Sequence, residues 1–230
     1  MDFGGLALER AIVDPDDRFY IDFLKDYYIR TADGQYLFAT MQNARRPDRV
    51  FYMVPESYRL GKNQNRFDSG TGKRIYNMAM EYLQSDISTM ALRGIQGEGR
   101  FETGLNYVLS VEIPHSAYLA WMGKQMVFPY RNGVAIKVFN YCIPEGLPED
   151  YKARIKEFYP QYEEPMILFD LTDIKNDVRK VLILGSDYFG EAFKKPNLTM
   201  VWNRAEESGY ISYHAGCTDK RILKGLSGTG

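Results

Sequence analysis

The sequence has few of the features that mark secreted, membrane or nucleic-acid-binding proteins. It contains two cysteines, Cys142 and Cys217, too few for a disulfide framework, so both are expected to be free thiols of a cytoplasmic protein. No apolar run approaches the roughly 18 residues of a membrane span, and residues 1–17 lack the basic flank and apolar core of a signal peptide. The formal net charge of −1 leaves no basic excess that would indicate nucleic-acid binding.

Apolar and aromatic residues, in contrast, are abundant. Hydrophobic residues make up 45% of the 230 residues, which is enough to bury a sizeable core. The chain has no internal repeat, low-complexity linker or clear internal boundary. Apolar runs typical of strands are mixed along the chain with segments of helical periodicity. We therefore expect an α/β or α+β domain built on a mixed β-sheet flanked by helices.

Strands are predicted where short apolar runs or alternating patterns occur. Residues 27–41 alternate around Asp33-Gly34, which predicts a β-hairpin. The apolar runs at 166–171 and 180–185 are expected to be central strands, because such runs are typical of strands that are buried on both faces. Further strands are expected at 49–54, 106–113, 134–141, 210–216 and 221–225.

Helices are predicted from the 3.6-residue period of the apolar positions. Residues 75–83 and 148–159 show this period, and Pro148 suits a helix start. Residues 115–126 are also expected to be helical. The stretch 190–202 is expected to be a helix or turn that is broken near Pro196. Loops are expected at 59–74 and 94–99.

The C-terminal stretch "GLSGTG" could belong to a phosphate-binding loop. Gly225 and Gly230 have the spacing of the two glycines in G-x-x-x-x-G-K-[ST], but the lysine that should follow is absent. Glycines allow backbone N–H groups to turn toward phosphate oxygens. A flexible polar tail would explain the same residues, so the stretch alone leaves both interpretations open.

A second group of candidate residues follows the predicted strand at 180–185. Tyr188, Glu191, Lys194 and Lys195 lie just after its carboxyl end, where the ligand crevice of an α/β sheet usually forms. The lysines could bind phosphate or carboxylate, and a buried lysine could lose its proton and act as a ligand or base. A solvated lysine pair is the alternative interpretation.

The remaining candidates are two arginines and the two histidines. Arg45 and Arg46 precede a predicted strand and could fork onto a carboxylate, although an ordinary basic turn is equally compatible. His214 lies on a predicted strand, where either a site or a structural role would suit it. His115 begins a predicted helix and has no obvious partner, so we expect it to be structural.

Taken in order along the chain, these segments resemble the ATP-type phosphoenolpyruvate carboxykinases. Arg45-Arg46-Pro47 resembles the Arg-Ser-Pro motif of the family, and "YFGEAFKK" at 188–195 resembles its "YGGEMKK" segment. His214 resembles the family's strand histidine, and "GLSGTG" matches the first six letters of the family's P-loop. The similarity spans roughly residues 40–230, in patches, and its most specific parts are the P-loop string and the segment 188–195.

The resemblance implies a role for each of these residues. Arg45 would hold the carboxylate of oxaloacetate or phosphoenolpyruvate, and Tyr188 would line the same pocket. His214 and one lysine would ligate a divalent metal, Mg or Mn. Spacing from His214 favours Lys195, whereas spacing from Glu191 favours Lys194. The nucleotide phosphate site would begin with Gly225, Leu226, Ser227, Gly228, Thr229 and Gly230.

The resemblance also implies a domain organisation and an activity. Residues 1–224 would form the N-terminal, substrate-side domain, and 225–230 the first half of a P-loop that leads into a nucleotide-binding C-terminal domain. The longer protein would use ATP to convert oxaloacetate to phosphoenolpyruvate by decarboxylation and phosphoryl transfer. The present chain is expected to show no such activity and no tight ATP binding, because the loop lysine and one metal ligand are missing.

The chain departs from the family pattern in ways that affect the expected substrate. Arg46 replaces the motif serine and Phe189 replaces a glycine, so the natural substrate need not be oxaloacetate. Two alternatives remain beside the carboxykinase interpretation. One is a binding or regulatory module that kept the fold without the chemistry. The other is a P-loop small-molecule kinase that accepts a different substrate in the Arg45 pocket.

Overall fold

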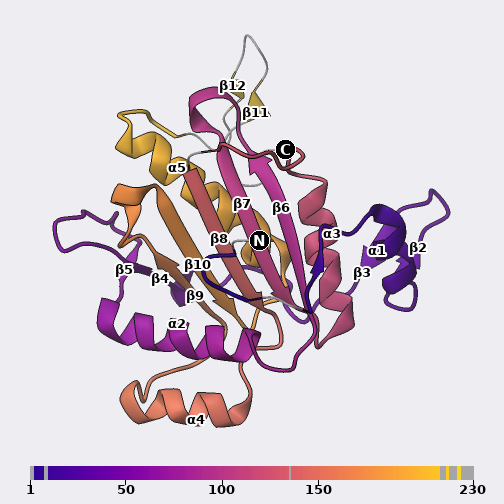
Figure 1. Ribbon diagram of the computed structural model, residues 1–230, viewed down its shortest axis with the longest axis horizontal. Helices are drawn as coiled ribbons and strands as arrows, with labels where there is room; N and C mark the ends of the chain where they lie inside the picture. Colours follow the sequence, from indigo (N-terminus) through magenta and orange to yellow (C-terminus); the bar gives the residue numbers. More distant parts are fainter. Residues whose placement is uncertain (1–2, 8–9, 135, 213–215, 218–221, 224–230) are drawn as a thin grey trace.

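A computed structural model describes residues 3–7, 10–134, 136–212, 216–217 and 222–223, which form a large mixed sheet with helices on both faces (Figure 1). The strands of this sheet are β1 (Ile12–Val13), β4 (Val50–Met53), β5 (Asn65–Arg66), β6 (Thr89–Gln96), β7 (Thr103–Ser110), β8 (Ile136–Ile143), β9 (Met166–Asp170) and β10 (Val178–Leu184). Their spatial order is β1-β6-β7-β8-β10-β9-β4-β5. The expected fold class, a mixed sheet flanked by helices, is confirmed.

The middle of the sheet is parallel and buried. β7, β8 and β10 run parallel, whereas β6 runs antiparallel to β7 and β9 antiparallel to β10. All eight residues of β7 are buried, as are residues 166–169 of β9 and 181–184 of β10. Strands that are buried on both faces need other elements packed against each face, because the side chains on both faces are apolar and avoid water. The runs at 166–171 and 180–185 are therefore central strands, as predicted.

The helices divide between the two faces of the sheet. They are α1 (Asp17–Phe23), α2 (Ser69–Leu83), α3 (Tyr118–Lys124), α4 (Glu149–Phe158), α5 (Lys195–Glu207), the 3-10 helices η1 (Pro47–Arg49), η2 (Gly99–Phe101), η3 (Pro114–Ala117) and η4 (Ile174–Asn176), and the π-helical turn η5 (Gly190–Lys194). α1, α3 and α5 pack on one face, here the α5 face, with Leu105 and Tyr107. α2 and α4 pack on the other, here the α2 face, with Val108 and Phe139. Alternate residues reach opposite faces because the strands are pleated.

The N-terminal third contains the predicted hairpin and an early helix start. β2 (Tyr28–Arg30) and β3 (Tyr36–Phe38) pair antiparallel, and Gly34 supplies the positive φ of 82° at the turn. The prediction of a loop over 59–74 is wrong for its last residues, because α2 already begins at Ser69. Asp68 caps this helix by accepting a hydrogen bond of 2.7 Å from the Thr71 N–H, a signal that the apolar period does not include.

Two further predictions were wrong about glycine and proline. The loop expected at 94–99 overlaps β6, which continues to Gln96. Gly94 is needed there because a Cβ would collide with the Val127 side chain, so it marks close packing rather than a turn. Pro196 does not break the helix predicted near it. It occupies the first turn of α5, where its missing N–H is not required, and η5 leads directly into that turn.

The remaining elements follow the sequence in type more than in extent. The helix expected over 115–126 consists of η3 and the shorter α3, whereas α4 matches its prediction within a residue. Of the strand expected over 210–216, residues 210–212 are not in a strand and 213–215 lie outside the described residues, whereas β11 (Gly216–Cys217) pairs with β12 (Ile222–Leu223). In the described part of the chain, no helix is long and apolar enough to cross a membrane.

Candidate functional site

Two distant segments of the chain meet beyond the carboxyl end of β10. One is the segment 185–195, which leads from β10 through η5 into α5, and the other is the segment 40–49, which leads into β4. Buried carboxylates on the first segment accept hydrogen bonds from backbone groups of the second. This attachment places the arginine motif predicted from the sequence beside the start of α5.

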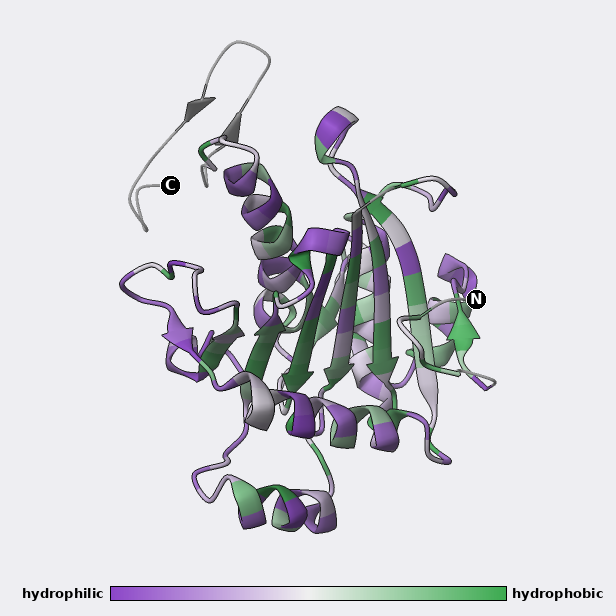
Figure 2. Ribbon diagram, turned by 60° about the vertical axis from the view of Figure 1, so that its left-hand side comes forward, coloured by the Kyte–Doolittle hydropathy of each residue, from purple (hydrophilic) through white to green (hydrophobic). Residues whose placement is uncertain are grey.

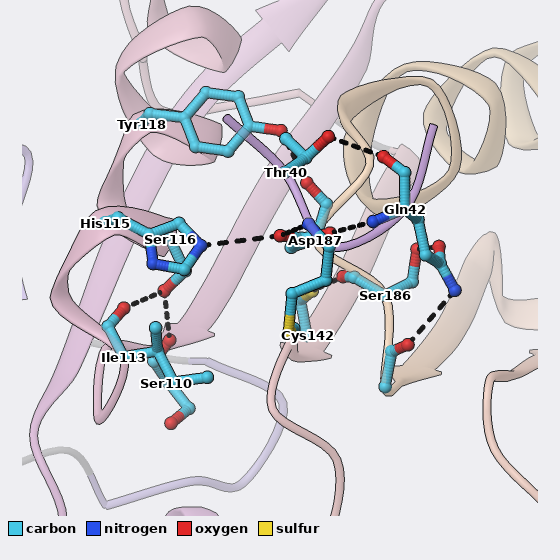
Figure 3. Close-up of polar contacts among 12 residues, drawn as sticks. Thr40, Gln42, Ser110, Ile113, His115, Ser116, Tyr118, Cys142, Ser186 and Asp187 are labelled. Carbon is cyan, nitrogen blue, oxygen red and sulfur yellow. Dashed lines mark hydrogen bonds and ion pairs between the residues drawn. The ribbon is translucent and has the colours of Figure 1, made fainter. Parts of the chain in front are cut away.

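Asp187 is the first of these carboxylates. Its side chain is completely buried and accepts hydrogen bonds from the backbone N–H of Met41, at 2.6 Å, and of Gln42, at 3.1 Å (Figure 3). The neighbouring Ser186 hydroxyl donates to the Gln42 side-chain oxygen at 2.6 Å. A buried carboxylate is tolerated when charge-assisted hydrogen bonds satisfy it, and here they hold the loop that precedes Arg45.

Glu191 holds the same loop on the other side of Arg45. Its Oε1 accepts a hydrogen bond of 2.8 Å from the Arg46 N–H, and its Oε2 lies 3.0 Å from the Ser186 hydroxyl, whose one proton is shared with the Gln42 side-chain oxygen. The residue lies in the π-helical turn η5 and is 3% exposed. Arg45 is therefore fixed on both sides, by Gln42 and by Arg46, while its own side chain remains exposed.

Arg45 and Lys195 line one small pocket on the α5 face, here the Arg45–Lys195 pocket. The other lining residues are Val50, Tyr52, Ile167, Phe169, Glu191, Pro196 and Thr199. Its enclosed space is about 30 Å³, so a ligand larger than a water would rest at its mouth against the exposed guanidinium. Among the described residues, none forms a hydrogen bond or ion pair with the Arg45 side chain.

Two positively charged side chains lie close together at this pocket. The pKa of Lys195 is lowered, first by its partial burial and then by the neighbouring positive charges of Arg45 and Lys194. Glu191 also lines the pocket, but both of its oxygens already accept hydrogen bonds. An anion at the mouth would relieve the repulsion between Arg45 and Lys195 and would be attracted by both.

The other predicted residues of segment 188–195 point elsewhere. Lys194 lines a separate apolar pocket that also contains Met126, Phe128 and Leu198. The Tyr188 ring packs over Gly190, and Tyr188 is not among the described residues that line the Arg45–Lys195 pocket. The structure thus brings Lys195, and not Lys194 or Tyr188, to Arg45. Sequence spacing left the choice between the two lysines open, because it does not show which of two adjacent side chains faces a given pocket.

The remaining expected residues belong to the metal and phosphate sites. His214 and the residues 225–230 lie outside the described residues. No group of three or more histidine, cysteine, aspartate or glutamate side chains suited to a metal occurs in the described ranges. Of the expected metal ligands, Lys195 faces the pocket, and its lowered pKa is in the direction that a neutral amine ligand requires. Comparisons with protein-family models and with curated proteins found no match for this chain.

His115 has a partner, Asp187, that its sequence context does not reveal. Its Nε2 lies 3.4 Å from Oδ2 of Asp187, and the hydroxyl of Tyr118 donates to the Asp187 carbonyl (Figure 3). Asp187 therefore joins three segments, namely the loop before β4, the segment after β10 and the η3–α3 region. One signal was available in the sequence, because an acidic residue directly after a buried strand must find hydrogen-bond donors.

Cys142 lies beneath this junction but has the properties of a structural thiol. It is a free, buried cysteine on β8, and its thiol donates to the Ser186 carbonyl at 3.9 Å. Burial strongly raises its pKa, so the reactive thiolate is disfavoured. The thiol is free, as expected, and it is buried away from solvent.

Proposed function

We propose that this chain is the substrate-side domain of a phosphoenolpyruvate carboxykinase-like enzyme and binds a small carboxylate, such as oxaloacetate or phosphoenolpyruvate. The observation that carries the proposal is the meeting of Arg45 and Lys195 in one pocket. These residues come from the two segments whose motifs resemble that family. They lie side by side without a carboxylate salt bridge among the described residues.

The chemistry of these side chains suits a small acid. The planar guanidinium of Arg45 can donate two parallel hydrogen bonds to a carboxylate, and Lys195 adds a compact charge. Glu191 and Asp187 keep the arginine loop in place, so less ordering is needed when the ligand binds. In the longer enzyme, a bound Mg or Mn ion would neutralise charge on the transferred phosphoryl group. Lys195 would help hold that ion once its amine has lost its proton, a change that its lowered pKa favours.

One observation favours the alternative of a small-molecule kinase with a different acceptor. Arg46 stands where the family has serine, and its guanidinium is paired with Asp48 at 2.9 Å. The position therefore contributes no hydroxyl to the pocket, and the neighbouring surface carries a guanidinium–carboxylate pair. The Arg46–Asp48 pair in place of a serine would alter which acid fits beside Arg45. Arg45 and Lys195 would still bind the carboxylate of that acid.

Calorimetric titration of this chain with a panel of acids tests the proposal. The panel should contain oxaloacetate, phosphoenolpyruvate, succinate, malate and acetate, with glycerol as the uncharged reference. We expect the doubly charged acids to bind more tightly than acetate, because two cations face the mouth of the pocket. Preference for oxaloacetate or phosphoenolpyruvate supports the carboxykinase interpretation, and preference for another acid supports the kinase. No binding of any acid would contradict both.

The affinity for these acids should depend on pH through Lys195. Its pKa in the free protein is lowered, so the ammonium loses its proton below the ordinary lysine value of about 10.4. As the pH rises through that lowered pKa, the positive charge is lost and acid binding weakens. In Lys195→Arg the charge persists, so the affinity should stay level over the same pH range. Identical pH profiles for the two proteins would show that Lys195 does not bind the acid.

A further inference from the structure

A separate apolar pocket lies along a different side of α5 from the Arg45–Lys195 pocket. Its volume is about 310 Å³, and three segments form it: the end of β6, the segment that follows α3, and the helix made of η5 and α5. The lining residues are Gln96, Gly97, Met126, Phe128, Phe193, Lys194, Leu198 and Val201, and together they define the Lys194 pocket. The Arg45–Lys195 pocket takes Lys195, Pro196 and Thr199 from the same helix, so the two adjacent lysines line different pockets.

The walls of the Lys194 pocket are held in place by regular backbone structure. Lys194, Leu198 and Val201 recur at spacings of four and three residues, which places them on one side of the helix. Figure 2 shows α5 beside the sheet, with both hydrophilic and hydrophobic residues along its length. Another wall is attached to β6, because Phe128 and Ile95 exchange two backbone hydrogen bonds of 2.9 and 3.0 Å. Little ordering is therefore needed when a ligand binds.

The apolar side chains around this pocket are only partly covered by the protein. Met126 and Phe128 are 50% and 53% exposed, although both are large hydrophobic residues. Leu198 and Val201 are half-buried beside them. An apolar ligand in the pocket would remove part of this surface from water, which favours its binding.

Two polar residues in the lining select among apolar ligands. Lys194 is exposed, and no carboxylate of a described residue is paired with it, so its ammonium is available to the carboxylate of a ligand. The side-chain oxygen of Gln96 is buried and has no hydrogen-bond partner among the described residues. A buried acceptor without a donor costs free energy, and an N–H group on a ligand would supply the donor.

We propose that the Lys194 pocket binds an apolar monocarboxylate, independently of the Arg45–Lys195 pocket. The carboxylate pairs with Lys194, and the apolar group lies against Phe128 and Leu198. The volume is near the lower end of small-molecule sites, which suits one ring or a short branched chain. A dicarboxylate would place its second charge against the apolar walls, so the two pockets select different acids.

Two kinds of molecule share this chemistry, and they differ at Gln96. An apolar α-amino acid carries an ammonium group that would donate to the Gln96 oxygen, whereas an apolar acid without an amino group would leave that oxygen unpaired. Phenylalanine and 3-phenylpropanoate are a matched pair of probes, because they have the same ring and carboxylate and differ in the ammonium group. 3-Phenylpropanol is the uncharged reference.

The test is a titration of the whole chain with these three probes, followed by calorimetry and by amide NMR shifts. We expect at least one of the two acids to shift the amides of residues 96–97, 126–128 and 198–201. That acid should bind about tenfold more tightly than 3-phenylpropanol, because only the acids pair with Lys194. Lys194→Gln should abolish the tenfold preference, and Lys194→Arg should keep it.

Three further variants control the experiment. Lys156→Gln is the matched control, because it removes an exposed lysine of α4 on the opposite face of the sheet. Phe128→Ala should weaken the binding of both acids, because it removes part of the apolar wall. Arg45→Gln should leave the shifts unchanged, so a failure of this proposal is distinguishable from a failure of the proposed function.

The two acids separate the two kinds of ligand. Tighter binding of phenylalanine identifies an amino-acid site, and tighter binding of 3-phenylpropanoate identifies a site for acids without an amino group. The proposal is overturned if neither acid shifts these amides, or if 3-phenylpropanol binds as tightly as both acids. It is also overturned if Lys194→Gln binds the acids like Lys156→Gln.

Discussion

Replacing Asp187 by alanine is expected to lower the free energy of unfolding by about 3 kcal/mol. The backbone N–H groups of Met41 and Gln42 would lose their acceptor in a site where the carboxylate is completely buried. His115 would lose its partner at the same time. Urea denaturation followed by circular dichroism measures the loss, because the buried junction and the sheet should unfold together.

Asp48→Ala is the matched control for this prediction. Asp48 is also near the arginine loop, but its carboxylate is exposed and pairs with the exposed side chain of Arg46. Surface pairs of this kind contribute at most about 1 kcal/mol, so this variant should unfold close to the wild type. Equal effects of Asp187→Ala and Asp48→Ala would contradict the anchoring role of Asp187.

The second large effect is expected on binding rather than on stability. Changing Arg45 or Lys195 to glutamine should each weaken the binding of a dicarboxylate by about 10- to 100-fold, because each removes a charge-assisted hydrogen bond. The double variant should show no measurable binding. Both side chains reach solvent, so neither change should lower the melting temperature appreciably. Calorimetry with succinate or phosphoenolpyruvate gives the affinities.

Lys194→Gln is the matched control for the binding experiment, because it removes the same charge one residue away. Lys194 lines the apolar pocket beside Phe128 and Leu198, so its loss should change the affinity by less than about threefold. A larger effect of Lys194→Gln than of Lys195→Gln would reverse the assignment of the two lysines. It would also contradict the pocket geometry on which the proposed function depends.

The candidate site was predictable in its parts but not in its assembly. Arg45 stood out because an arginine pair can fork onto a carboxylate, and Lys195 because it follows the carboxyl end of a central strand. Tyr188 and Lys194 also follow the strand at 180–185, yet neither is among the described residues that line the Arg45–Lys195 pocket. Lys194 lies in the π-helical turn η5, and local sequence patterns do not distinguish such a turn from an ordinary α-helical one.

By itself, the sequence determined the class of fold and the central strands, because apolar runs such as 166–171 and 180–185 must be buried on both faces. It also determined the hairpin at Gly34, since turn chemistry acts over a few residues. Only the tertiary structure decided that Asp187 and Glu191 hold the loop of Arg45, and that Lys195 lines the same pocket as Arg45. These contacts join residues far apart in the chain, and their energies depend on burial and register, which exist only once the sheet has formed.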